Sequence, residues 1–158
     1  MRIDKTEDSN ESKLHIYRET PPKCDWIVHL CMNGVTCSEC DKEETGFLPY
    51  ACNAHTHGME KYGHQDFQMV LSYPPKEIMY ILNSLGFRVQ AGERFSSDEY
   101  VSGIYLDCDI KLIEFEESER KVLRVIVPDK FGRFPDDPLC MEEYRHQLLP
   151  MSELYNAK

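Results

Sequence analysis

One stretch of the sequence, PPKEIMYILNSLG at residues 74–86, constrains the fold more than any other. Its apolar side chains recur at positions i, i+3, i+4 and i+7, which places them on one face of a helix: they are Ile78, Ile81, Leu82 and Leu85. Pro75 suits the first turn of a helix, and Gly86 suits the position directly after its end. The pattern predicts one principal helix with a single apolar face, which must pack against another element.

Runs rich in β-branched and aromatic residues supply that other element. They lie on both sides of the helix in the sequence, at residues 25–31, 66–73, 100–106, 109–115 and 122–128. The links between the later runs are short, which favours antiparallel pairing. We therefore predict an α+β fold, in which a mostly antiparallel sheet carries one principal helix on a face.

The chain has 158 residues, which is enough for one domain of ordinary size and too short for two. Residues 1–13 are polar and predict a disordered arm, and residues 14–150 predict the single domain. Within that domain, residues 31–64 form a Cys/His-rich segment without helical or strand periodicity, for which we expect a loop. The stretch after residue 128 is rich in Pro, Gly and Asp and predicts an irregular C-terminal strap, followed by a tail over 151–158.

The charge balance narrows the choice of partners. Lys and Arg number 18 against 28 Asp and Glu, which gives a net charge of -10. A field of this sign repels phosphate backbones and anionic lipid, so neither nucleic acid nor membrane is an expected partner. The sequence has no apolar run near the roughly 18 residues that a membrane span needs, and its first residues lack the apolar core of a signal peptide. We expect a cytoplasmic protein with an unknown protein or small-molecule partner.

Seven cysteines in a cytoplasmic protein are not expected to form disulfides, so some of them are candidate metal ligands. Three cysteines and three histidines fall within residues 37–64. Their spacing, Cys37-x2-Cys40-x11-Cys52-x2-His55, gives two ligand pairs of the kind that tetrahedral zinc sites use. The hypothesis is a structural Cys3His zinc site that orders the loop through its binding energy.

Several alternatives to this ligand set remain open. Cys31, His57 and His64 are replacement ligands, and His55 with His57 on an extended segment could share an open, catalytic metal completed by His64 or Glu60. A thiol nucleophile at Cys52 with a histidine base is a third option. The remaining histidines and cysteines are isolated and indicate surface or core positions: His15, His29, His146, Cys24, Cys108 and Cys140.

A second candidate site combines the end of this segment with residues near the ends of later elements. Its members are His57, His64, Glu93, Asp129 and Arg133. The acidic stretch EFEESER at 114–120 indicates a solvated hairpin loop.

Three stretches in this order, GHQDFQMVLSYPPKEIMYILNSLG, RVQAGERF and VLRVIVPDKFGRFPDDP, resemble a bacterial family of uncharacterised proteins known as domain of unknown function 4262. The resemblance covers about residues 24–150, and its most specific part is the strap. The positions that match are Gly63, His64, Glu93, Asp129, Gly132, Arg133, Phe134 and Pro135. The resemblance implies a single α+β domain and no named activity. The chain departs from the family over Cys37–His57, where other members carry a plain strand.

Three functions follow from these features. The first is a binding or interaction protein whose loop is ordered by zinc. The second is a small metal-dependent or thiol enzyme, with a site between the His55–His64 loop and the Asp129–Arg133 strap. The third is an acidic immunity or inhibitor protein, which its charge and size favour.

Overall fold

The computed structural model describes residues 23–34, 46–117 and 119–155. In this part of the chain, six strands form one mixed sheet in the order β2-β3-β4-β7-β6-β5. Their bounds are β2 Ile27–Cys31, β3 Ala51–His57, β4 Asp66–Leu71, β5 Glu99–Val101, β6 Ile110–Glu117 and β7 Arg120–Ile126. Neighbouring strands are antiparallel except β4 and β7, which run parallel at the centre. The predicted α+β fold with a mostly antiparallel sheet is confirmed.

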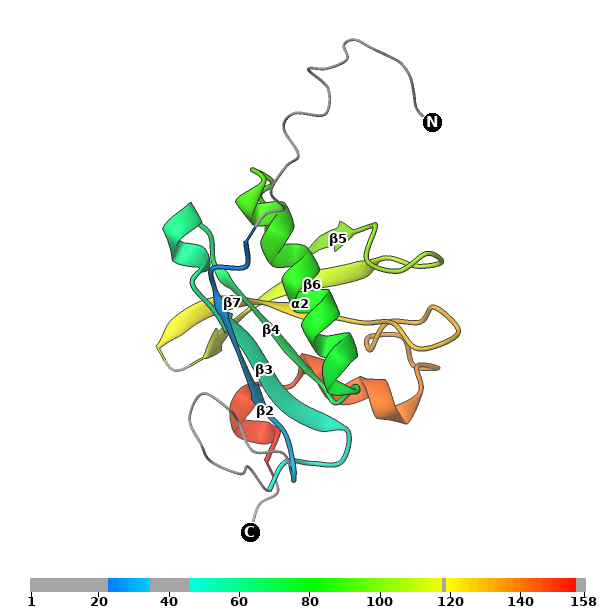
Figure 1. Ribbon diagram of the computed structural model, residues 1–158. Coiled ribbons are helices and arrows are strands. Elements are labelled where there is room, and N and C mark those ends of the chain that lie inside the picture. The colour runs from blue at the N-terminus through cyan, green and yellow to red at the C-terminus, as the bar shows by residue number, and fades with distance from the viewer. Residues whose placement is uncertain (1–22, 35–45, 118, 156–158) are drawn as a thin grey trace.

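Helix α2, Pro75–Gln90, lies across one face of this sheet (Figure 1). The predicted apolar stripe is buried against the sheet, together with Val89. The predicted end of the helix is wrong, because Gly86 lies inside the helix and not after it. The reason is packing: a Cβ atom at position 86 would stand 2.6 Å from Cζ2 of Trp26, so the glycine makes room for the indole ring.

The expectation of a loop over residues 31–64 is wrong for its second half. Residues Ala51–His57 form β3, which pairs with β2 on one side and β4 on the other. Cys52 and Ala54 face the α2 side and are fully buried, while Asn53, His55 and His57 face the other side. The alternation of apolar and polar side chains along β3 was hard to recognise in the sequence. The residues on its second side, Asn53, His55 and His57, are uncharged or weakly basic and not the charged residues that usually mark the solvent face of a strand. The predicted strand 100–106 is also shorter than expected, since β5 ends at Val101.

The second face of the sheet has a smaller apolar cluster, covered by the strap. Buried Phe47, Ala51, Val70 and Leu154 form this cluster. The strap contains the 3-10 helix η3 (Glu142–Leu148), and a second one, η4 (Met151–Glu153), follows it. Leu154 is fully buried, so the packed part of the chain continues beyond residue 150, where we predicted a tail. The predicted arm 1–13 and residues 156–158 lie outside the described residues.

Candidate functional site

The structure does not bring Cys52 and His55 of the predicted zinc set together. The Cys52 side chain is buried in the core beneath α2, where its thiol donates to the Leu71 carbonyl over 3.5 Å, and burial raises its pKa to about 12. His55 points to the opposite face of β3, where it contacts Asn53 and Glu117. Two side chains on opposite faces of one strand cannot share an ion. Cys37 and Cys40 lie outside the described residues.

Three histidines instead gather on the face away from α2. In the antiparallel register His29 of β2 pairs with His55, and Ile27 pairs with His57, so all three imidazoles share one face. The ring centroids of His29 and His55 are 5.3 Å apart, those of His29 and His57 4.8 Å, and those of His55 and His57 4.9 Å. Cys31 pairs with Asn53 and belongs to the same face. Within the described residues, no group of three or more His, Cys, Asp or Glu side chains could hold a metal ion as they lie.

His55 is oriented by a polar pair. Its Nδ1 lies 3.1 Å from Oδ1 of Asn53 and 3.4 Å from Oε2 of Glu117. Both partners are acceptors, so Nδ1 carries the proton and Nε2 keeps its lone pair. Burial lowers the pKa of His55 to about 4, although the Glu117 carboxylate opposes this shift, and His57 is shifted in the same direction by desolvation. Both imidazoles are therefore neutral near pH 7.

Arg120 ties this cluster to the start of β4. Its Nη1 lies 2.6 Å from Oδ2 of Asp66, and its Nη2 lies 3.2 Å from Oε1 of Glu117. Glu117 and Asp66 are both more than nine-tenths buried, so Arg120 pairs with two carboxyl groups that are sheltered from solvent. The prediction of a solvated hairpin loop is wrong for Glu117, which is 8 % exposed at the end of β6.

The polar face continues along β4 and β7. Gln68 donates to Oδ1 of Asn53 at 3.2 Å and accepts a hydrogen bond from Nε of Arg124 at 2.8 Å. Arg124 is fully buried, with its guanidinium 3.6 Å from the centre of the Phe115 ring, and burial lowers its pKa to about 10. Its Nη1 donates to the Gln147 carbonyl at 2.9 Å, which fixes the strap on this face.

The second predicted site, from His57 to Arg133, is not assembled. His64 precedes β4 and Asp129 follows β7, and because these strands are parallel, the two residues lie at opposite ends of the sheet. Nε2 of His64 accepts a hydrogen bond from the Phe95 amide at 3.0 Å, and Nδ1 lies 2.8 Å from the Gln65 carbonyl, so both nitrogens are used. Glu93 forms an ion pair with Arg88 at 2.6 Å, which holds the pKa of that carboxyl below its usual value. These residues therefore do not form the groove that the enzyme hypothesis needs.

Asp129 holds the strap in shape. Its Oδ1 accepts hydrogen bonds from the amides of Phe131 and Arg133, and its Oδ2 accepts one from the amide of Met141, each at 2.9 Å. Nε of Arg133 lies 3.5 Å from Oδ2. Asp129 thus has a structural role that its match to the family pattern alone does not specify.

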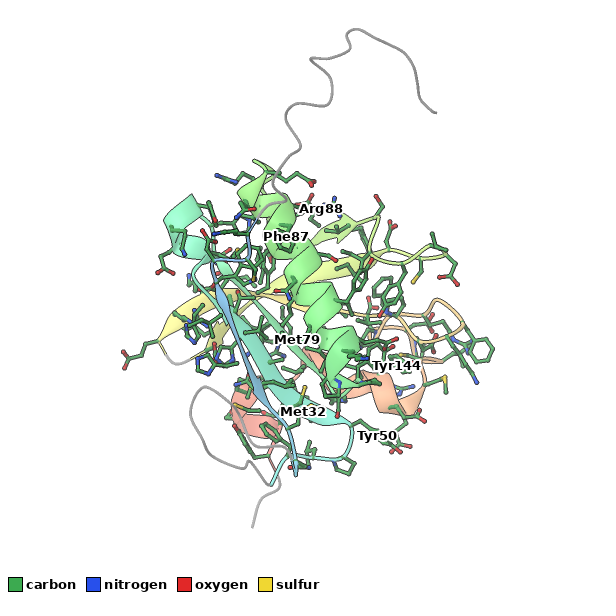
Figure 2. All side chains as sticks on the ribbon, in the orientation of Figure 1. Met32, Tyr50, Met79, Phe87, Arg88 and Tyr144 are labelled. Atoms are coloured by element: carbon green, nitrogen blue, oxygen red, sulfur yellow. The ribbon has the colours of Figure 1, made fainter. Side chains whose placement is uncertain are left out.

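Beside Asp129 lies a cavity of about 470 Å³, here called the tyrosine cavity. Its aromatic and apolar lining comprises Tyr73, Tyr105, Val127, Pro128, Phe131 and Tyr144. Tyr73 and Tyr144 have their hydroxyls 3.3 Å apart. The Tyr105 hydroxyl is buried and makes no hydrogen bond of ordinary length and angle with the described residues. Burial raises the pKa of Tyr105, and a weaker hydrogen-bonding interaction with Tyr73 opposes that rise. Tyr73 precedes α2, so Tyr144 lies at the end where this helix begins, and Figure 2 shows it away from Phe87 and Arg88.

Comparison with protein-family models, with curated proteins and with solved structures found no match. The resemblance to the uncharacterised bacterial family therefore stays a prediction. No helix in the described ranges is long and apolar enough to cross a membrane.

Sequence analysis did not identify several residues of these sites, among them His29, Glu117, Arg120 and Tyr105. His29 was read as isolated, because its neighbours His55 and His57 come from a strand about 26 positions away and only the register joins them. Glu117 and Arg120 were assigned to a loop, although their positions at the end of β6 and the start of β7 make them a cross-strand pair. Tyr105 carried no signal at all, since an unpartnered hydroxyl is visible only in a packed structure.

Proposed function

We propose that the protein is a ligand-binding domain that takes an uncharged planar molecule into the tyrosine cavity. The observation that supports this most directly is the buried Tyr105 hydroxyl, which makes no hydrogen bond of ordinary length and angle, in the wall of a cavity of about 470 Å³. A buried polar group without a hydrogen bond costs about 1 to 3 kcal/mol. A ligand that offers an acceptor atom to this hydroxyl would recover that free energy, and the recovered free energy would favour binding of the ligand in the cavity.

The position of the cavity also favours binding. Tyr73 follows the end of β4, and Val127, Pro128 and Asp129 follow the end of β7, so the cavity lies beyond the carboxyl ends of the parallel pair. Ligands of α/β sheets commonly bind at such ends, where neighbouring connections diverge. Four of the eleven residues that line the cavity are aromatic, and aromatic side chains are common in small-molecule sites.

The lining selects for the chemistry of the ligand. Burial raises the pKa of Tyr73 and of Tyr105, so both phenols stay protonated and can donate. In the Tyr73 and Tyr144 pair one hydroxyl donates to the other, and the accepting hydroxyl keeps its own hydrogen. That hydrogen is a second donor for a ligand, in addition to the Tyr105 hydroxyl. The Asp129 carboxylate is already satisfied by three backbone amides. These features favour a planar ring system with two oxygen or nitrogen acceptors and no net charge.

A pair of probes of similar size tests this proposal. N-methylphthalimide has two carbonyl acceptors on a flat bicycle, and indane has none. We expect the first to shift the NMR ring signals of Tyr73, Tyr105 and Tyr144, and indane to bind at least about tenfold more weakly, which corresponds to one hydrogen bond of about 1.4 kcal/mol. Equal binding of the two probes, or binding of neither, would overturn the proposal.

The variant Tyr105→Phe separates binding from stability. It removes the buried hydroxyl and keeps the ring, so we expect the free energy of unfolding to stay constant or rise by about 1 kcal/mol while N-methylphthalimide binding weakens about tenfold. Tyr50→Phe, at a half-exposed tyrosine outside the cavity, is the matched control and should change neither quantity. Unchanged probe binding by Tyr105→Phe would contradict the role given to this hydroxyl.

A further inference from the structure

We propose that His29, His55 and His57 form a binding site for one divalent transition-metal ion on the face of the sheet opposite α2. This site is separate from the tyrosine cavity and does not depend on the function proposed for it. Three imidazoles from two paired strands stand within 4.8 to 5.3 Å of one another, measured between ring centroids. Imidazole nitrogen is a preferred ligand of zinc, copper, nickel and iron ions.

The spacing of the rings fits a common ion. With Zn–N bonds of about 2.1 Å and tetrahedral angles, three bound imidazoles have their centroids about 5 Å apart. The rings now stand stacked or edge to face, with interplanar angles of 16°, 82° and 81°. Since the described side chains could not hold an ion as they lie, binding requires the rings to turn about their side-chain bonds. The strands themselves need not move, because the register already sets the spacing.

The hydrogen bonds of His55 leave one of its ring nitrogens for an ion. Its Nδ1 faces the acceptors of Asn53 and Glu117, at 3.1 and 3.4 Å, so its Nε2 lone pair is the one left for an ion. Metal-binding histidines typically donate their second ring N–H to a carboxylate or carbonyl in this way. Glu117 is fixed in turn by Arg120 at 3.2 Å. The Glu117 carboxylate therefore lies against Nδ1 of His55, and Nε2 of the same ring is left for an ion. The rings of His29 and His57 lie beside the His55 ring.

The site differs from the zinc site that the cysteine spacing predicts. Cys52 lies on the α2 side of β3 and cannot join it, whereas Cys31 shares the histidine face. A site of three imidazoles leaves a fourth position for water or for one thiolate. Spectroscopy separates the two ligand sets, because thiolate bound to Co²⁺ gives intense near-ultraviolet charge-transfer absorption and imidazole does not.

The test is a titration of the full, tag-free and metal-stripped chain with Co²⁺, followed by visible absorption, and with Zn²⁺, followed by calorimetry. We expect one ion per chain. His29→Ala and His57→Ala should each weaken binding by about tenfold or more, in line with the effect of losing parts of a metal site. Cys52→Ala, Cys37→Ser and Cys108→Ser should leave the affinity unchanged. His57 is exposed, so its variant is expected to stay folded, which far-ultraviolet circular dichroism checks.

The outcomes are distinct. Binding that depends on the histidines supports the site, and a thiolate band that Cys31→Ser removes would support it with Cys31 as the fourth ligand. A thiolate band that Cys37→Ser removes, affinity indifferent to His29 and His57, or no binding at all would overturn it. A measurement without variants gives the same decision: Co²⁺ should displace the imidazole proton signals of His29, His55 and His57 in the unmodified protein, and unchanged signals would exclude the site.

Discussion

The contact between Gly86 and Trp26 gives the sharpest prediction for stability. In an exposed helix, replacing an interior glycine by alanine stabilises by about 1 kcal/mol. At position 86 the new Cβ atom would lie 2.6 Å from Cζ2 and 2.8 Å from Cε2 of the indole, far inside van der Waals contact. We therefore expect Gly86→Ala to destabilise the protein in spite of the helix propensity of alanine.

The indole cannot move away cheaply. Its Nε1 donates to Oδ1 of Asn83 at 2.8 Å, and its ring packs edge to face on Phe87 with centroids 4.8 Å apart. Trp26 is also 6 % exposed, so a shift would open apolar contacts as well. Overpacking of this kind costs about 1 to 3 kcal/mol. After the gain in propensity of about 1 kcal/mol is subtracted, the net loss in the free energy of unfolding should be up to about 2 kcal/mol.

Urea denaturation measures this loss, with Trp26, the sole tryptophan, as a fluorescent probe and circular dichroism as a second one. The control repeats Gly86→Ala in a Trp26→Leu background, followed by circular dichroism alone. There the clash is relieved, so alanine should be neutral or stabilising, and the cycle yields a coupling energy between the two sites. If Gly86→Ala stabilises the protein that retains Trp26, the packing explanation of this glycine is refuted.

Further predictions concern titration, reactivity and the strap. The pKa of His55 falls from an ordinary 6.5 to about 4 on folding, so between these pH values the unfolded chain binds a proton that the folded protein does not. The free energy of unfolding should therefore decline from about pH 7 towards pH 4, by up to about 3 kcal/mol. In urea denaturation at several pH values, His55→Gln should make the free energy of unfolding depend less on pH. Cys52 should resist iodoacetamide in the folded protein while exposed Cys24 reacts, as mass spectrometry of the labelled peptides will show; fast labelling of Cys52 would contradict its burial. Asp129→Ala should lower the free energy of unfolding by about 2 kcal/mol or more, because three amides lose their acceptor, and Asp129→Asn by less; equal stability of all three proteins would speak against the role of Asp129 in the strap.

The elements whose apolar pattern repeats with one period could be predicted. The stripe from Ile78 to Leu85 indicated α2, and the β-rich runs gave β2, β4, β6 and β7 to within a few residues. β3 was missed because two of its outward positions, Asn53 and His55, are polar yet sheltered by neighbouring strands, and only the last one, His57, is exposed. Pattern reasoning assumes that such residues face water.

The candidate sites were harder to predict than the fold. Cys52 and His55 have the right separation for a turn, but they lie on a strand, where an odd difference in position sends them to opposite faces. His29 joins His55 only through the register, and Tyr144 joins Tyr73 and Tyr105 only through the path of the strap. Neither relation is encoded in local spacing. Position in the sheet, and not distance in the sequence, decides which of these residues meet.

The parallel pairing of β4 with β7 has a consequence for the synthesis of this protein. Asp66 pairs with Val122, so 56 further residues must be synthesised before β7 can pair with the edge of β4 that faces away from β3. At a translation rate of 5 to 20 residues per second, that wait is roughly 3 to 11 s. During this time a nascent chain can already pack α2 against β2, β3 and β4, but one strand edge of that half-sheet remains open to other chains. The ribosome-bound intermediate is therefore the state in which this protein is most exposed to misassembly.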